Sequence, residues 1–364
     1  MFRALAVVAL VGCGGAKYPG PTTAKPEVKL KGGLDDAALP YQVLERKGTQ
    51  IDEAAFWTRI AKARAVCVGE EHPNPHHHWM QLHVVREVSK RLGGDKLAVG
   101  LEMIQRPFQG PLDDYAAKRI DSETLRSRVG WAERWGYDYS FYGPTLDATI
   151  AAGGSLLALN TAKELTKKVV RQGLESLTPD EKLLLPELDL TDPTHRAWFD
   201  ALMSDMGGSS AHSTKKEEPA APDDKSGERR TRSTAEGDAK VNDKKEPPVD
   251  NPHKSKDGGG EASAMPSAER IYTAQVLWDE TMADGAAKWL KANTNGHLVI
   301  LAGNGHCHDS AIVNRMKRRG VTDVLSVRVV IDDGEGSVAE ALAKPINDFV
   351  MILQLPKQAK TAAK

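Results

Sequence analysis

Six short apolar runs, separated by stretches with helical periodicity, constrain the fold of this 364-residue chain more than any other feature. Four are AVCV, LAVGL, SLLAL and LVILA, at positions 65–68, 97–101, 155–159 and 298–302, and VLSVRVVI and FVMILQL follow later. Apolar runs that alternate with amphipathic helices are typical of crossover units. We therefore predict an α/β fold: a mostly parallel sheet with helices on both faces and a ligand site at the carboxyl rim of the strands.

Polar groups follow these runs where the strands should end. Glu70 and His72 follow the first run, Glu102 the second and His306 the fourth. The ends of parallel strands about 4.8 Å apart meet at one edge, so we expect these four side chains to converge. Adjacent side chains diverge, so Glu70 and not Glu71 should face the site. Two carboxylates and two imidazoles suit a divalent metal ion or a general acid and base, which makes the four candidate metal ligands and candidate catalytic residues.

The segment VCVGEEHPNPHHHWMQLH holds five of the 11 histidines of the chain. Asn74 can cap a helix that begins at the following proline, which would place His76 and His77 on its first turn, near the rim. We keep these two as candidate site residues. We interpret His78 and His83 as packing residues of the same helix.

A second concentration of chemistry is the aromatic segment WAERWGYDYSFYGP, at positions 131–144. Its spacing predicts a helix that becomes extended, and its rings can line a pocket for a planar cofactor or simply cover the core. Tyr137 and Tyr142 are the candidate phenolate ligands if that pocket holds an iron porphyrin. In GNGHCH, His308 projects to the same side as His306 if the chain stays extended there.

The N-terminus, MFRALAVVALVGCGG, reads as a secretion signal, with a cation, an apolar run and small residues. LVGC resembles a bacterial lipoprotein cleavage box, so we expect a signal peptide at 1–12, a lipidated Cys13 and a membrane tether at 13–38. The alternative is an ordinary signal peptide that contains a cysteine. Gly14 favours the outer membrane over the inner one.

Composition divides the rest of the chain. Residues 207–264 contain no Leu, Ile, Phe, Met, Tyr or Trp, and residues 213–257 carry 11 basic and 11 acidic residues. We predict a disordered charged insertion there, a single α/β domain at 39–206 and 265–356, and a tail at 357–364. A net charge of −1 gives no reason to expect nucleic acid as a partner. Only Cys67 and Cys307 remain beside Cys13, so we expect no disulfide framework.

Taken together, six motifs resemble the ChaN family of haem-binding uptake lipoproteins, in the larger group with the Tiki and TraB proteins. They are VGEEHPNPHHH, GLEMIQRPFQ, GWAERWGYDYSFYGPTLDAT, LALNTAKEL, AQVLWDETMA and LAGNGHCH. The resemblance runs from about Tyr41 to Leu355. It implies an α/β domain at the cell envelope that binds haem, can form a homodimer, and carries site residues at Gly69–His72, Gly303–His306, Glu102 and Tyr142.

The resemblance favours a lipid-anchored protein of the bacterial cell envelope that binds haem in iron or haem uptake, with an outer-membrane haem receptor as a partner. Arg106 would pair with a propionate, and the candidate contacts to haem are His72, His76, His77, Tyr137, Tyr142, His306 and His308. Tiki-like relatives imply an alternative, a metal-dependent hydrolase or peptidase at the Glu/His rim. The residues alone do not decide between the two, nor whether the protein is an enzyme.

Overall fold

The computed structural model describes residues 39–211 and 266–355. The described parts of residues 1–202 and 266–364 belong to one compact unit; of a second unit, Met203–Met265, only residues 203–211 are described. The expected signal peptide, Cys13, the tether, the tail and the insertion from residue 212 onward lie outside the described residues. Helix α9 (Pro193–Ala211) continues past residue 207, where we expected the insertion to begin.

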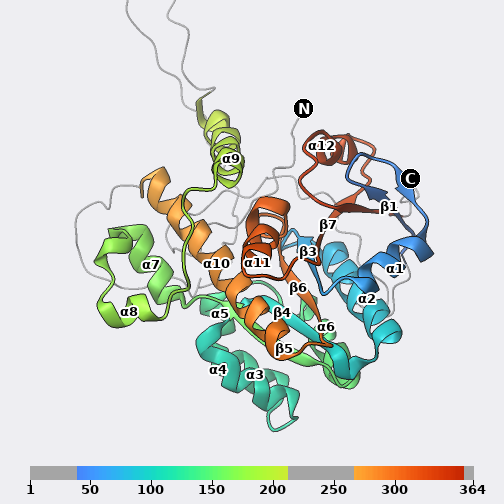
Figure 1. Cartoon of the computed structure of the whole chain (residues 1–364), viewed down its shortest axis with the longest axis horizontal. Helices are drawn as coiled ribbons and strands as arrows, with labels where there is room; N and C mark the ends of the chain where they lie inside the picture. Colours follow the sequence, from blue (N-terminus) through green and yellow to red (C-terminus); the bar gives the residue numbers. More distant parts are fainter. Residues whose placement is uncertain (1–38, 212–265, 356–364) are drawn as a thin grey trace, which may run out of the picture. The chain divides into compact units, whose positions relative to one another are not determined.

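The strands of the described residues form one eight-stranded sheet, in the order β2-β1-β8-β7-β3-β6-β4-β5 (Figure 1). The six strands from β8 to β5 are parallel, whereas β1 and β2 pair antiparallel at one edge. The predicted mostly parallel sheet is confirmed, and all six apolar runs are strands. The strands are β1 (Tyr41–Glu45), β2 (Gln50–Ile51), β3 (Ala65–Glu70), β4 (Leu97–Gln105), β5 (Ser155–Asn160), β6 (His297–Gly303), β7 (Val324–Ile331) and β8 (Phe349–Leu353).

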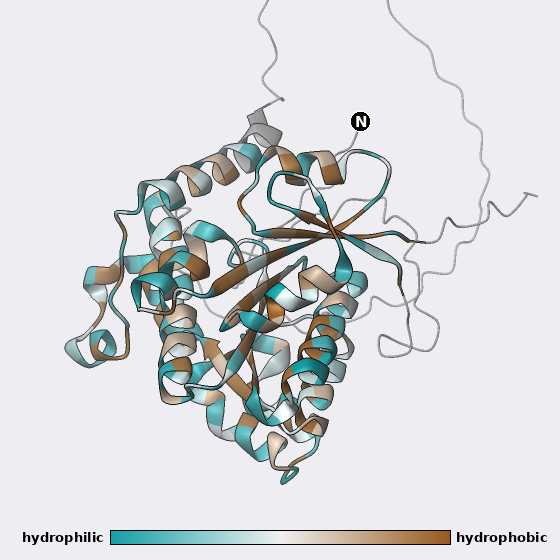
Figure 2. Ribbon diagram, turned by 45° about the vertical axis from the view of Figure 1, so that its right-hand side comes forward, coloured by the Kyte–Doolittle hydropathy of each residue, from teal (hydrophilic) through white to brown (hydrophobic). Residues whose placement is uncertain are grey.

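Helices cover both faces of the sheet because alternate strand residues are apolar on both sides. In β3, Val66 and Val68 pack into one core and Ala65 and Cys67 into the other, and the strands are accordingly the most hydrophobic ribbons in Figure 2. The first core is closed by α1 (Glu53–Lys62), α2 (Pro75–Leu92), α3 (Gln109–Ala116), α4 (Ser122–Val129), α5 (Trp131–Arg134) and α6 (Gly143–Ala151). The opposite face carries α10 (Ala268–Ala292), α11 (Asn314–Arg318) and α12 (Ser337–Ala343), with α7 (Lys163–Gln172) packed on α10, and α8 (Pro179–Leu183) follows α7.

The turn from β3 into α2 fixes the first histidines. The Asn74 side chain accepts a hydrogen bond from the His76 N–H at 3.1 Å, and Pro75 occupies the first helical position, as predicted. Gly93, at φ 85°, ends the helix. The histidines His76, His77 and His78 therefore lie on the first turn of α2, which faces the end of β3.

The aromatic segment departs from its prediction. After α5 the chain forms a 3₁₀ helix, Tyr139–Phe141, because the Asp138 carboxylate caps it by accepting a hydrogen bond from the Ser140 N–H at 2.9 Å. The expected extended conformation is therefore wrong at these residues.

Among the helices of residues 39–211 and 266–355, none combines the length and the hydropathy that crossing a bilayer requires.

Candidate functional site at the carboxyl rim of the sheet

Three adjacent strands bring the predicted rim residues together. β6 lies between β3 and β4, Glu70 is in register with Gly303, and Leu101, which precedes Glu102, is in register with Leu301. The two glutamates therefore flank the end of β6, on strands that are 32 residues apart in the sequence. Both carboxylates are buried.

Glu70 is held by two histidines and a tyrosine. Its Oε1 lies 2.6 Å from His72 Nδ1 and accepts from the Tyr142 hydroxyl at 3.3 Å, while its Oε2 lies 2.7 Å from His78 Nδ1. Burial alone would raise the pKa of Glu70, but His78 and His72 outweigh it and hold the pKa well below its ordinary value. Glu70 is therefore an ionised anchor, and His78, which we expected only to pack, is part of the site.

The second glutamate is part of a chain of acidic groups and imidazoles. The His306 ring lies between two carboxylates, with Nδ1 2.6 Å from Asp279 Oδ1 and Nε2 3.4 Å from Glu102 Oε1, and Glu102 Oε2 accepts from the Gly303 N–H at 2.6 Å. Burial would lower the pKa of His306, but Glu102 and Asp279 raise it to about 10. His306 is therefore a buried imidazolium that joins α10 to the end of β4.

Asp279 is the site residue that the sequence reading missed. It lies fully buried in α10, one turn after Gln275, whose side-chain nitrogen is 3.1 Å from His306 Nδ1. The motif WDETMA contained a signal for it, because it places an acidic residue on the apolar, buried side of a helix. The signal could not name the partner, which is 27 residues away in the sequence.

The Glu70–His72 pair and the Glu102–His306 pair meet at Gly303, where a larger residue would be tight. A Cβ there would lie 3.1 Å from His72 Cε1, 3.4 Å from His72 Nε2 and 3.7 Å from Glu102 Oε2. Burial would lower the pKa of His72, but Glu70, and more weakly Glu102, raise it above its ordinary value. The His72 ring and the Glu102 carboxylate thus approach one backbone position from two sides.

The four predicted residues lie together as two pairs, Glu70 with His72 and Glu102 with His306. Within each pair the carboxylate contacts the imidazole. Within residues 39–205 and 266–355, no three His, Cys, Asp or Glu side chains are grouped so that they could hold a metal ion. The assignment of Glu70, His72, Glu102 and His306 as metal ligands or catalytic residues stays a prediction.

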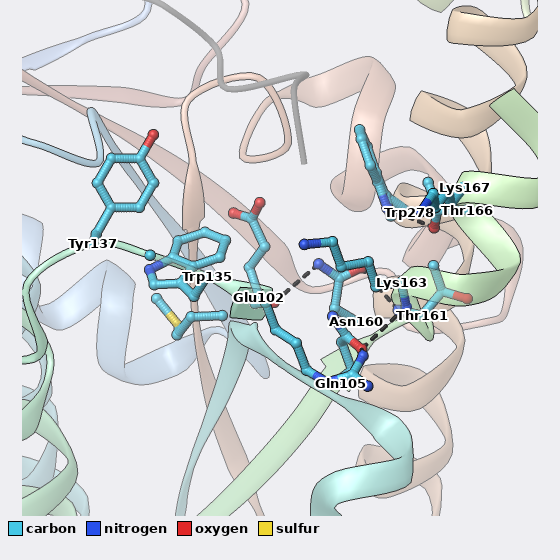
Figure 3. Close-up of a pocket in the computed structure, with 13 residues that line it drawn as sticks. Glu102, Gln105, Trp135, Tyr137, Asn160, Thr161, Lys163, Thr166, Lys167 and Trp278 are labelled. Atoms are coloured by element: carbon cyan, nitrogen blue, oxygen red, sulfur yellow. Dashed lines mark hydrogen bonds between the residues drawn. The ribbon is translucent and has the colours of Figure 1, made fainter. Parts of the chain in front are cut away.

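A pocket with a volume of about 200 Å³ opens beside this cluster. Figure 3 shows the Glu102 carboxylate between two walls, with Trp135 and Tyr137 on one side and Trp278 with residues of α7 on the other. The His72 ring lies behind the first wall, with its centroid 4.7 Å from that of Trp135 and 4.9 Å from that of Tyr137. The cations that line the pocket are Arg134, Lys163 and Lys167.

Residues 56–316 match the model of the family described as "Haem-binding uptake, Tiki superfamily, ChaN", which spans more than half of the chain. The chain belongs to this family. Its fold is that of a solved structure titled "Cofacial heme binding to ChaN of Campylobacter jejuni", with a TM-score of 0.55 and 14% identity over 86% of this chain and 97% of that one. Family membership and fold thus agree with the predicted resemblance.

One curated relative is of a different length. Protein RETICULATA-RELATED 5, chloroplastic, of Arabidopsis thaliana is 30% identical over 139 residues, which are 36% of this chain and 18% of that protein. The chain therefore spans less than a fifth of this relative.

In this ChaN-family chain, Tyr137 lines the pocket and Tyr142 does not. Tyr142 is 2% exposed, its hydroxyl faces Glu70, and burial raises its pKa far above the ordinary value. The pKa of Tyr137 is also raised, first by burial and then by Glu102 and Glu70. Of the two predicted phenols, the structure brings only Tyr137 to the pocket.

Three further predicted residues lie away from the pocket. His77 is buried and its Nδ1 accepts from the Glu71 N–H at 2.9 Å, and burial lowers its pKa to about 3. His76 is also buried on the first turn of α2 and does not line the pocket. Arg106 lies 3.4 Å from an Asp284 carboxylate oxygen, so it pairs with this side chain instead of lining the pocket.

His308 does not share a side with His306, because the chain turns after Gly303. Its ring is fully buried with its centroid 4.3 Å from that of Trp198, and burial lowers its pKa to about 3. Its Nδ1 lies 3.3 Å from Ser310 Oγ. The extended conformation that would have placed the two side chains on one side is therefore not present.

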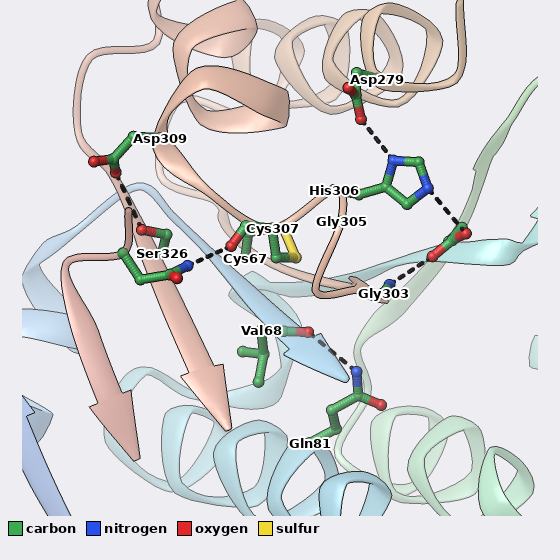
Figure 4. The surroundings of a disulfide bond; sticks show 12 residues. Cys67, Val68, Gln81, Asp279, Gly303, Gly305, His306, Cys307, Asp309 and Ser326 are labelled. Carbon is green, nitrogen blue, oxygen red and sulfur yellow. Dashed lines mark hydrogen bonds and ion pairs between the residues drawn. A yellow bond between two sulfur atoms is a disulfide. The ribbon is translucent and has the colours of Figure 1, made fainter. Parts of the chain in front are cut away.

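From the sequence there was no reason to expect a disulfide framework, and the described residues contain one disulfide that was not predicted. Cys67 in β3 and Cys307 form a disulfide across a sequence separation of 240 residues (Figure 4). Both residues are buried, and the Asn347 side chain donates to the Cys307 carbonyl at 2.6 Å. The bond fastens the turn that carries His306 onto the middle of the sheet.

Proposed function

We propose that this chain is a lipid-anchored envelope protein that binds haem at the rim pocket and takes part in haem or iron uptake. The observation that carries the proposal is the wall of Trp135 and Tyr137, backed by a histidine that a carboxylate holds in place. Flat aromatic side chains suit a porphyrin face, and a phenol or imidazole is an iron donor that haem proteins use.

The residues present fit haem. Tyr137 offers a phenol in the pocket itself, and the ring of His72, whose Nδ1 faces Glu70, packs against it with a centroid distance of 4.9 Å. The pocket, at about 200 Å³, is below the roughly 300–1,000 Å³ of sites that enclose a ligand. Haem would therefore be held against an open surface, which leaves room for a second copy of the chain or for a partner such as an outer-membrane haem receptor.

The disulfide supports the envelope location. Disulfides persist in oxidising compartments and are rare where thiols are kept reduced. A buried bond between Cys67 and Cys307 is consistent with the secretion signal and the LVGC box. Metabolic labelling with palmitate in a bacterial host tests the anchor: wild type should be labelled and Cys13→Ser should not.

A haemin titration tests the binding. Wild type should give a Soret band that saturates, and Tyr137→Phe should weaken binding or shift the band because the phenol is lost. Tyr115→Phe is the matched control, since it removes the same atom from a tyrosine outside the pocket whose hydroxyl donates to Asp147 and not to a rim residue. Absence of the band in wild type would overturn the proposal, and equal spectra for all three proteins would exclude Tyr137 as a donor.

Metal-dependent hydrolysis is not favoured as the function. A hydrolytic metal needs ligands with free lone pairs and an open position. Glu70 is taken up by His72, His78 and Tyr142. Glu102 is taken up by the Gly303 N–H and His306, and His306 also contacts Asp279.

A further inference from the structure

The two walls of the pocket differ in chemistry. Trp135 and Tyr137 form an apolar wall, whereas the opposite wall carries Lys163 and Lys167 of α7 (Figure 3). Trp278 stands beside the lysines, with its indole N–H donating to Thr166 Oγ1 at 3.0 Å. The pocket therefore suits a ligand with a flat apolar face and an acidic edge.

The positions of the two lysines are unfavourable for the helix itself. Lys163 is the first residue of α7, where the macrodipole is positive and disfavours cations. Lys167 follows at i+4, where two like charges on one helix face repel each other. Residues that destabilise their own helix are expected mainly at functional sites. We therefore interpret the two lysines as the binding site of an anionic ligand.

No carboxylate of the described residues lies within ion-pair distance of these lysines, although the neighbouring Glu164 interacts with Lys163 at longer range. Lys163 Nζ donates to the uncharged Glu133 carbonyl, and Lys167 has no ion-pair partner in the part of the chain that the structure describes. The nearby Glu102 is engaged by His306 and the Gly303 N–H.

Arg134, the third cation that lines the pocket, already has partners within the chain. Arg134 Nη2 lies 2.8 Å from Glu164 Oε1, and its Nη1 donates to Gln105 Oε1 at 2.8 Å. The unfilled capacity for an anion thus lies on α7.

We infer that Lys163 and Lys167 bind the carboxylate edge of the porphyrin, while its flat face lies against Trp135 and Tyr137. This rests on the proposed haem binding and deepens it, because it makes the site selective for a porphyrin with free carboxylates. It also replaces Arg106 as the propionate partner expected from the sequence.

The test compares haemin with iron protoporphyrin dimethyl ester, in the same dilute detergent, on the full chain. Wild type should prefer haemin, and the preference should shrink as salt rises because the ion pairs are exposed. Lys167→Met should lower haemin affinity by about 2- to 5-fold, and the double Lys163→Met/Lys167→Met variant by on the order of tenfold, with ester affinity unchanged. Lys317→Met, an exposed lysine of α11 outside the pocket, is the matched control and should behave as wild type.

Stability separates binding from a structural role. Because Lys167 sits unfavourably on α7, Lys167→Met should unfold at the same or a higher urea concentration than wild type while binding haemin more weakly. A lower urea midpoint together with unchanged haemin preference would overturn the inference. Equal wild-type affinity for haemin and ester would also overturn it and leave haem binding intact, whereas no binding of either porphyrin would overturn the proposed function itself.

Discussion

Reduction of the Cys67–Cys307 disulfide should lower the free energy of unfolding by several kcal/mol. The bond closes a loop with a sequence separation of 240 residues, and the chain-entropy relation gives about 5.5 kcal/mol at 25 °C for a loop of that length. Removing a native disulfide commonly costs about 2–5 kcal/mol, so we expect about 4 kcal/mol. At the usual dependence on denaturant, the urea midpoint should fall by about 1 to 2 M.

The assay is equilibrium urea unfolding followed by tryptophan fluorescence, with and without a phosphine reductant. Both sulfurs are buried, so the reductant should act mainly on unfolded chains and samples must reach equilibrium. The double variant Cys67→Ala/Cys307→Ala should unfold near the midpoint of the reduced wild type and should not respond to the reductant.

Two results would refute this reasoning. Coincident midpoints for the oxidised and reduced wild type would show that the cross-link does not stabilise the fold. Alkylation of both Cys67 and Cys307 in unfolded protein that had never met a reductant would show that the bond does not form.

Two further predictions concern the rim. The pKa of His306 is about 10 in the folded chain against an ordinary 6.5, so its stabilising contribution is complete below pH 6.5 and is lost as the pH rises through about 10. The difference in urea midpoint between wild type and His306→Gln should therefore narrow from pH 6.5 to 10, and a constant difference would contradict the charged bridge to Asp279. Gly303→Ala should push the His72 ring away and weaken haemin binding in the same titration, because the new Cβ would lie 3.1 Å from that ring. The matched change Gly110→Ala, with no atom within 4 Å of the new Cβ, should leave binding unchanged; equal effects would show that the close approach at Gly303 is unimportant.

The strand ends could be predicted because their signal is local. Each apolar run is followed at once by its polar residue, and parallel strands must present those ends at one edge. Glu70, His72, Glu102 and His306 were found in this way. The start of α2 was predictable for the same reason, since Asn74 and Pro75 are adjacent to the turn that they form.

Partners distant in the sequence could not be predicted. Nothing near Asp279 marks it as the carboxylate beside His306, and His78 differs from its neighbours only by the helical angle that aims it at Glu70. Two cysteines 240 residues apart gave no reason to pair them. In the sheet Cys67 is in register with Ile300 of β6, and the turn that follows Gly303 brings Cys307 to Cys67.

By itself, therefore, the sequence determined the α/β class and the edge of the sheet at which four polar side chains gather. Both signals are local, because apolar periodicity and the residues that follow each apolar run act over a few positions. Only the tertiary structure decided which of these residues pair, which tyrosine reaches the pocket, and that α7 supplies two of the three cations that line it. Those choices depend on the packing of α10 and α7 against the strand ends, and the distances between side chains far apart in the chain are set only when the helices dock.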